Sequence, residues 1–172
     1  MTFADGAVLT ASQLNTFLRD NMLETEVSLA TGAANYFVAS ARHQIRERTP
    51  GTARVDTAES TQSSYADLAT VGPQVTVDTG TRAWVFFGCQ MENSGGTSTA
   101  FASFDITGAT NREAHNQFAI SLDGVSANQG QRFANWELVD NLTPGENIFT
   151  MKYQVGSNTG TFRNRFIAVF PM

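Results

Sequence analysis

The sequence predicts a mainly β protein in which an N-terminal amphipathic helix precedes an antiparallel β-sandwich. Three observations favour this fold class: glycine and phenylalanine are abundant, charged residues are scarce, and short apolar runs alternate with turn signals after residue 65. Of the 172 residues, 16% are charged, 14 are glycines and 13 are phenylalanines. This balance is typical of β domains with many turns, and the length allows one domain with an appendage.

An N-terminal arm and helix are expected in residues 1–31. Thr10 precedes Gln13 by the spacing of a capping box, which satisfies free backbone N–H groups at a helix start. We therefore expect a helix that begins near Ala11 and ends before Gly32. Apolar residues recur along it at helical spacing and form one stripe, which consists of Leu14, Phe17, Leu18 and Met22.

This stripe is a candidate assembly interface. A helix of this length is marginal alone in water, because nucleation is unfavourable and packing supplies most helix stability. The stripe therefore covers the chain's own β domain, or it contacts another copy or another protein. The second alternative is favoured, since a long polar stretch separates the helix from the first strong strand. Asn21, Thr25 and Ser28 replace the Leu or Ile of a long coiled coil, so a coiled-coil shaft is not expected.

Residues 32–64 are expected to form a connector with one or two short strands, because a short apolar piece at 36–38 is followed by a polar stretch. Residues 65–172 are expected to form the sandwich. Its apolar runs are QVTV, RAWVFFGCQM, AFASFDI, QFAISL, FANWELV, NIFTMKYQV and TFRNRFIAVF. About eight strands predict a two-sheet jelly roll, with an immunoglobulin-like sandwich as the alternative. The single cysteine, Cys89, excludes the disulfide-linked version of the latter and reads as a small buried residue.

The strand patterns predict which faces are covered. In NIFTMKYQV the apolar residues alternate with polar ones and are expected to point inward; they are Phe149, Met151, Tyr153 and Val155. RAWVFFGCQM and RFIAVFPM are more continuously apolar, which favours covering on both sides by the second sheet or by a neighbouring subunit. The last run therefore provides a second candidate interface, although a central strand of a monomer is equally consistent. Its residues are Phe166, Ile167, Val169 and Phe170.

The residues provide little for catalysis or for a metal. Both histidines, His43 and His115, lie in polar loop contexts, and no nucleophile or metal motif accompanies them. Nothing in the sequence joins any two carboxylates into a hydrolytic pair. The candidates are Asp67, Asp78, Asp105, Glu113, Asp123, Glu137 and Asp140. Trp84 and Trp136 could form a sugar-stacking platform if exposed, but their apolar runs favour the core. No enzyme, cofactor or metal is therefore expected.

The charge and the N-terminus restrict partners and location. A net charge of −5 with scattered arginines argues against nucleic acid. The first residues lack the charged and apolar regions of a signal peptide, and no run has the length of a membrane span. We expect synthesis in the host cytoplasm and no membrane insertion.

Several stretches resemble a known group of proteins. GAVLTASQLNTFLRDNM resembles the N-terminal segment of minor tail and fibre-like proteins of tailed phages that infect actinobacteria. SSYADLATVGPQVTVDTGTRAWV, FASFDITGAT, LTPGENIFTMKYQV and GTFRNRFIAVFPM look like the β domain that often accompanies it. The resemblance implies a virion structural protein, homotrimeric, displayed on the tail or on the capsid.

Three functions follow as hypotheses. The first is a minor tail or fibre-type protein whose helix attaches the chain to other virion proteins and whose β domain contacts the host surface. The second is a capsid decoration protein that binds the major capsid lattice. The third is a glycan-binding or glycan-cleaving sandwich, with a host-surface glycan as partner, and it is the least favoured because the histidines and carboxylates show no grouping.

Overall fold

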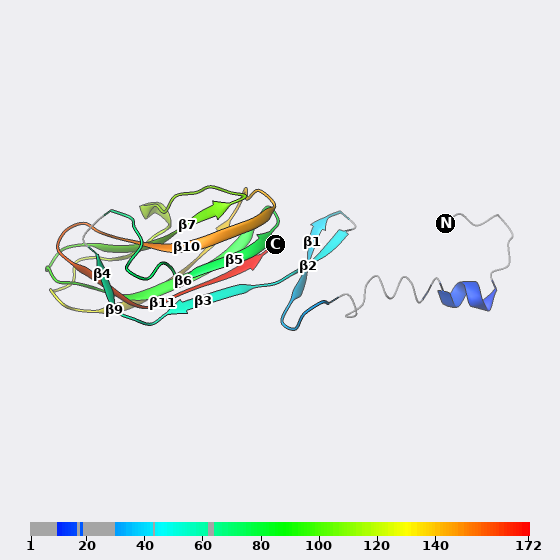
Figure 1. The fold of residues 1–172 in the computed structure, drawn as a ribbon, viewed down its shortest axis with the longest axis horizontal. Coiled ribbons are helices and arrows are strands. Elements are labelled where there is room, and N and C mark those ends of the chain that lie inside the picture. Colours follow the sequence, from blue (N-terminus) through cyan, green and yellow to red (C-terminus); the bar gives the residue numbers. More distant parts are fainter. Residues whose placement is uncertain (1–9, 17, 19–29, 43, 62–63) are drawn as a thin grey trace.

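Two antiparallel sheets packed face to face make up the body of the protein (Figure 1). The computed structural model describes residues 10–16, 18, 30–42, 44–61 and 64–172. We name each sheet by its edge strands. The β5/β8 sheet contains, in order, β5 (Gln74–Thr79), β10 (Gly145–Val155), β7 (Ala100–Gly108) and β8 (Ile120–Leu122). The β3/β9 sheet contains β3 (Gly51–Val55), β11 (Gly160–Pro171), β6 (Ala83–Asn93) and β9 (Gln131–Val139), and β4 (Glu59–Thr61) also pairs with β11.

The strand pairing is that of a jelly roll. Counting from β3 and leaving out β4, the first strand pairs with the last, β11, and the second, β5, pairs with the second last, β10. The next pairs inward are β6 with β9 and β7 with β8. The chain is thus one long hairpin wrapped into two sheets, which confirms the predicted architecture over the immunoglobulin-like alternative.

The core lies between the two sheets and follows the predicted alternation. Phe149, Met151 and Tyr153 of β10 are fully buried and Val155 is 5% exposed, so the inward face predicted for this strand is confirmed. Across the core, Phe87 of β6 packs edge to face on Phe104 of β7, with ring centroids 5.1 Å apart. Cys89 is buried as predicted, and this burial raises the pKa of its thiol to about 12.

The sandwich begins earlier than residue 65, the boundary that the sequence predicted. β3 lies inside the expected connector and pairs with β11, from Val55 opposite Arg165 to Gly51 opposite Val169. A Cβ at Gly51 would lie 2.2 Å from a methyl group of Val75, so this edge strand approaches the opposite sheet as only glycine permits. The segment GTARV is short and mostly polar, which is why its periodicity did not reveal a sandwich strand.

Before β3 the chain forms a two-stranded hairpin at the end of the sandwich where β11 ends (Figure 1). It consists of β1 (Tyr36–Ala41) and β2 (Gln44–Arg48). Tyr36 donates a hydrogen bond from its hydroxyl to the Pro171 carbonyl oxygen, at 2.5 Å, and Arg48 pairs with Asp78 of β5 at 2.6 Å. An isolated two-stranded hairpin is marginally stable in water. These two contacts with the sandwich therefore stabilise it.

The predicted capping box is confirmed. The Thr10 backbone N–H donates to the Gln13 side-chain oxygen at 3.0 Å, and the Gln13 N–H donates to the Thr10 hydroxyl at 3.2 Å. Residues 11–16 and 18 are helical. Leu14 and Leu18 are 45% and 55% exposed, whereas Phe17 and Met22 of the predicted stripe lie outside the described residues. No helix in the described part of the chain is long and apolar enough to cross a membrane.

Candidate functional site: an aromatic groove

The structure divides the predicted C-terminal interface into two faces of β11. Ile167 and Val169 point between the sheets and are 1% and 0% exposed, so they are core residues. Phe166 and Phe170 point to the outer side of the β3/β9 sheet. Phe166 lies over Gly88, where a Cβ would come within 2.6 Å of its ring, and Phe170 is 37% exposed. Of the four residues predicted for this interface, Phe166 and Phe170 therefore lie on an outer face.

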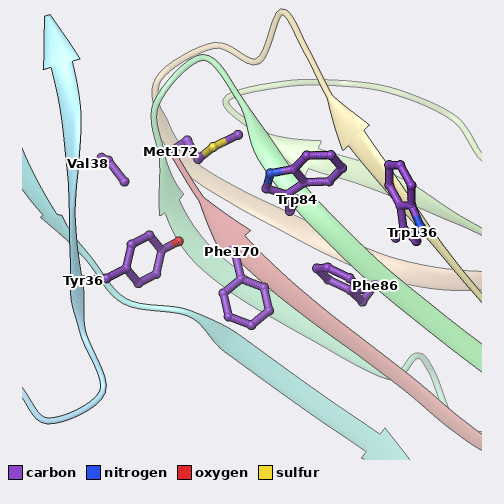
Figure 2. A pocket seen from close by; sticks show the side chains of 7 residues that line it. All are labelled: Tyr36, Val38, Trp84, Phe86, Trp136, Phe170 and Met172. Atoms are coloured by element: carbon purple, nitrogen blue, oxygen red, sulfur yellow. The ribbon is translucent and has the colours of Figure 1, made fainter.

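Phe170 belongs to an aromatic groove between the hairpin and the outer face of the β3/β9 sheet (Figure 2). The groove has a volume of about 890 Å³. Its lining consists of Tyr36 and Val38 of β1, Trp84 and Phe86 of β6, Trp136 of β9, Phe170 of β11, and Met172. Of these seven residues, only Trp84, Trp136 and Phe170 are surface or interface candidates from the sequence alone.

Strand register brings these rings together. Phe86 lies directly opposite Trp136, and Phe170 lies directly opposite Trp84, so all four side chains share one face of the sheet. Trp84 and Trp136 meet edge to face, with ring centroids 5.0 Å apart, and Phe86 and Phe170 do so at 5.7 Å. Tyr36 reaches Phe170 from the hairpin, at 6.4 Å between centroids.

The core role that the sequence favoured for the tryptophans is wrong. Trp136 is 58% exposed, and Trp84 is partly buried on the outer face. For Trp84 the reason lies in the alternation of β6, where Val85 and Phe87 point inward while Trp84 and Phe86 point outward. Trp136 of β9 lies opposite Phe86 and shares this outer face. Since both faces are apolar, the run looked continuous. Its inner face is covered by the β5/β8 sheet, as predicted, and its outer face is open in the single chain.

The groove provides hydrophobic contact and few hydrogen bonds. None of the described residues that line it is charged. The Tyr36 hydroxyl is already engaged with Pro171, and burial raises its pKa to about 12, so it stays protonated. Recognition of a sugar or other small polar ligand needs converging polar groups beside the aromatic rings. This lining is better suited to an apolar protein surface.

A basic cleft adjoins the groove. Met172 lines both, and the second cleft also contains Arg46 and Arg48 of β2. Arg48 is 5% exposed and is paired with Asp78, whereas Arg46 is exposed beside Val38 in the hairpin register. An apolar surface and a positively charged rim therefore lie side by side at this end of the sandwich.

Five of the candidate carboxylates form structural ion pairs: Asp67, Asp78, Asp105, Glu137 and Asp140. Lys152 binds Asp67 at 2.7 Å and Asp105 at 3.3 Å, and burial raises the pKa of Asp105 although Lys152 opposes this shift. Arg112 and Glu137 form a two-point ion pair at 2.6 and 3.2 Å.

His115 is exposed and its ring nitrogen accepts the Gln117 N–H, as suits a loop residue, while His43 lies outside the described residues. Within the ranges that the structure describes, no three His, Cys, Asp or Glu residues could hold a metal ion.

Comparison with known proteins shows the fold. No protein-family model and no curated protein sequence matches the chain. Among solved structures, the VP2 subviral particle of infectious bursal disease virus aligns with a TM-score of 0.50 and 11% identity. This alignment covers 84% of the chain and 41% of VP2, so the chain spans about two fifths of the VP2 length. The chain is a jelly-roll β-sandwich similar to this domain of a viral particle protein.

Two further solved structures align with lower scores. Eiger TNF from S. frugiperda has a TM-score of 0.49 at 8% identity, with 74% of this chain and 94% of that chain covered. The enzymatically active domain of bacteriophage CBA120 tailspike protein 4 has a TM-score of 0.35 at 14% identity, with 70% and 19% covered.

Proposed function

We propose that this chain is a non-enzymatic structural protein on the surface of a tailed-phage virion, of the minor tail or fibre type, and that it acts as a homotrimer. The observation that carries the proposal is the aromatic groove, an apolar outer face on a sandwich whose core is already complete. The sequence resemblance to tail proteins supplies the virion setting, and the jelly-roll fold is compatible with it.

The physical argument is the energetics of exposed apolar surface. Removing such surface from water contributes about 25 cal/mol per Å², and a contiguous apolar patch on the surface often marks an interaction site. A sandwich that functions as a monomer would carry polar side chains on the outer faces of its sheets, which point away from the core. Here Trp136, Phe86 and Phe170 occupy those positions with exposures of 58%, 40% and 37%. We infer that assembly covers them.

The layout of the chain suits a component with an attachment end and a free end. β11 runs toward the hairpin and the groove, so the loops before it lie at the opposite end. These loops are tied together: the Ser94 N–H donates to the Thr159 carbonyl at 2.9 Å, and the Asn128 N–H to the Asn93 carbonyl at 2.8 Å. In this proposal the end of the sandwich where the copies assemble through helix and groove is turned to the particle, and the tied loops at the opposite end face the host.

Counting copies in purified particles tests the proposal. Quantitative mass spectrometry against the major capsid protein, with gold-labelled antibody in electron microscopy, is expected to find a few copies per particle located on the tail. Copies in a fixed ratio to the major capsid protein, located on the shell, would support capsid decoration instead. Particles that lack the protein would overturn both virion assignments.

A further inference from the structure

We propose that the aromatic groove of one copy receives the apolar stripe of the N-terminal helix from a neighbouring copy. This inference deepens the proposed function and rests on its homo-oligomeric part, because it names the partner of the groove. The occupant is the helical segment that begins at Thr10, and its contact residues are Leu14 and Leu18.

Both surfaces are uncovered in the same chain. Leu14 and Leu18 are 45% and 55% exposed, and they lie four residues apart, so their side chains sit next to each other on one helix face. Trp136 remains 58% exposed in the groove, so the chain's own helix does not cover it. A short helix with an exposed apolar stripe is unstable alone, and it gains most of its stability from a surface that buries the stripe.

The size of the groove favours a helix over a second sheet. A stable interface between two copies typically uses about 20 to 30 residues on each side. The groove has seven lining residues, which is too few for two sandwiches to dimerise face to face through it alone. A helix that lays anchors at positions i and i+4 into an apolar groove is a common mode of recognition and needs only such a strip.

Charge complementarity points to the same occupant. Acidic residues lie within and after the span of the stripe, at Asp20, Glu24 and Glu26, and the only basic residue among residues 19–29 is Arg19. The cleft beside the groove carries the exposed Arg46, while Arg48 in the same cleft is already paired with Asp78. Attraction between an acidic segment and a basic rim fixes the direction in which a helix lies in a groove, and salt screens it.

Exchange of helices between copies would produce a cyclic assembly such as the proposed homotrimer. The contact joins two different surfaces, a helix stripe on one copy and a groove on the next, which is a head-to-tail interface. Such interfaces close into rings when the rotation permits. A ring of three copies would bury all stripes and all grooves at once, in agreement with the proposed homotrimer.

Site-specific cross-linking of the full chain tests this contact. Cys89 is fully buried, so it will react slowly and can stay in place. Chains with Leu14→Cys are mixed with differently tagged chains with Trp136→Cys, and a short thiol cross-linker is added. We expect a mixed dimer that forms at least ten times faster than in two matched controls.

The controls change one surface at a time. Ser12→Cys places the thiol about 200° around the helix from Leu14. Thr76→Cys places it on the exposed face of β5, in the opposite sheet. Equal rates in the controls would overturn the proposal. So would cross-links between two Trp136→Cys chains that form as fast as the mixed product, or cross-links confined to a single chain that carries both Leu14→Cys and Trp136→Cys.

Intrinsic fluorescence provides a second readout. Both tryptophans of the chain line the groove, so their emission reports whether it is covered. We expect the emission maximum to shift to longer wavelength when the wild-type protein is diluted, and to stay at the long-wavelength position at all concentrations in Leu18→Asp. If the wild-type chain is absent from particles, the proposed function fails. If it is present but the stripe and groove do not cross-link, only this contact fails.

Discussion

Trp84 and Trp136 meet edge to face on the outer side of the β3/β9 sheet, with ring centroids 5.0 Å apart. They come from neighbouring strands, and the second of them is 58% exposed. Rings of this size usually contribute to a core or to an interface, because each removes a large apolar area from water. In this chain the core is complete without them, so the proposed assembly assigns them to an interface.

Trp136→Ser is expected to weaken self-association with little effect on folding. The side chain is largely exposed, so the free energy of unfolding should change by about 0.5 kcal/mol or less. Sedimentation equilibrium gives the oligomeric state and urea denaturation gives the stability. Phe87→Ala is the contrasting variant, because this fully buried ring should cost about 3 to 5 kcal/mol of stability. A Trp136→Ser protein that associates as the wild type does would contradict the role of the groove.

Leu18→Asp is expected to abolish assembly and leave the sandwich folded. It places a charge on the helix stripe, at a side chain that is 55% exposed in the single chain, and burial of an unpaired charge opposes association. Ser12→Asp is the matched control, because a negative charge in the first helical turn is favourable and lies off the stripe. Sedimentation and circular dichroism separate the two effects. Assembly that survives Leu18→Asp would exclude the stripe as an interface.

Ile167→Ala and Phe170→Ala are expected to differ in their effects on stability and association, because the two side chains lie on opposite faces of β11. Ile167 is 1% exposed, so its truncation should lower the free energy of unfolding by about 2 to 5 kcal/mol. Phe170 is 37% exposed. Its truncation should lower the free energy of unfolding of the monomer by less than half as much, and it should also weaken association. Urea denaturation at low protein concentration measures both variants. Equal losses would mean that the two residues share one environment.

Glu59→Gln is expected to destabilise the protein because it leaves Arg165 without its ionic partner. Between Arg163 and Phe166 the register of β11 shifts, and Arg165 lies fully buried with a guanidinium nitrogen 3.3 Å from the Glu59 carboxylate. Arg165 is buried but Glu59 is partly exposed, so removal of this partner should cost about 1 to 3 kcal/mol. Asp56→Asn is the control, since its pair with Arg54 is exposed and should contribute about 1 kcal/mol or less.

The same residue predicts a pH effect. Burial alone would raise the pKa of Glu59, but the hydrogen bond from Thr70 and the charge of Arg165 outweigh it, so the pKa lies below the usual 4.5. A carboxyl group with a lowered folded pKa stabilises the fold above its unfolded pKa and loses this contribution as the pH falls through the folded value. Stability should therefore fall below about pH 4.5, and less steeply in Glu59→Gln. Parallel curves for the two proteins would contradict this assignment.

Local signals in the sequence predicted the parts of the fold that depend on neighbouring residues. The Thr10 and Gln13 capping box and the inward face of β10 follow from spacing within one element, and both are confirmed. The series of runs and turns was sufficient for the jelly roll as well. The helix stripe stays a prediction as an interface, and so does the outward part of the C-terminal strand.

Features that depend on contacts across the fold were missed. β3 joins the sheet only because β11 passes beside it, and its own five residues carry a weak apolar pattern. The sequence predicts a core position for Trp84 because β6 is apolar on both faces, and periodicity does not distinguish a covered outer face from an open one; Trp136 of β9 lies opposite Phe86 on the same open face. The continuously apolar run RAWVFFGCQM was the sequence signal for this outer face. It predicted that both faces of the strand are covered, and the single chain covers only the inner one.

We infer that other copies cover the open aromatic face of the sheet in the working protein. Sedimentation equilibrium of the purified wild-type chain, with acrylamide quenching of its tryptophans at the same concentrations, tests it most directly. We expect an oligomer in which acrylamide quenching of the tryptophans is suppressed. Dilution should release monomers, and quenching should increase over the same concentration range. A monomer at all concentrations, with tryptophans open to acrylamide throughout, would contradict the claim.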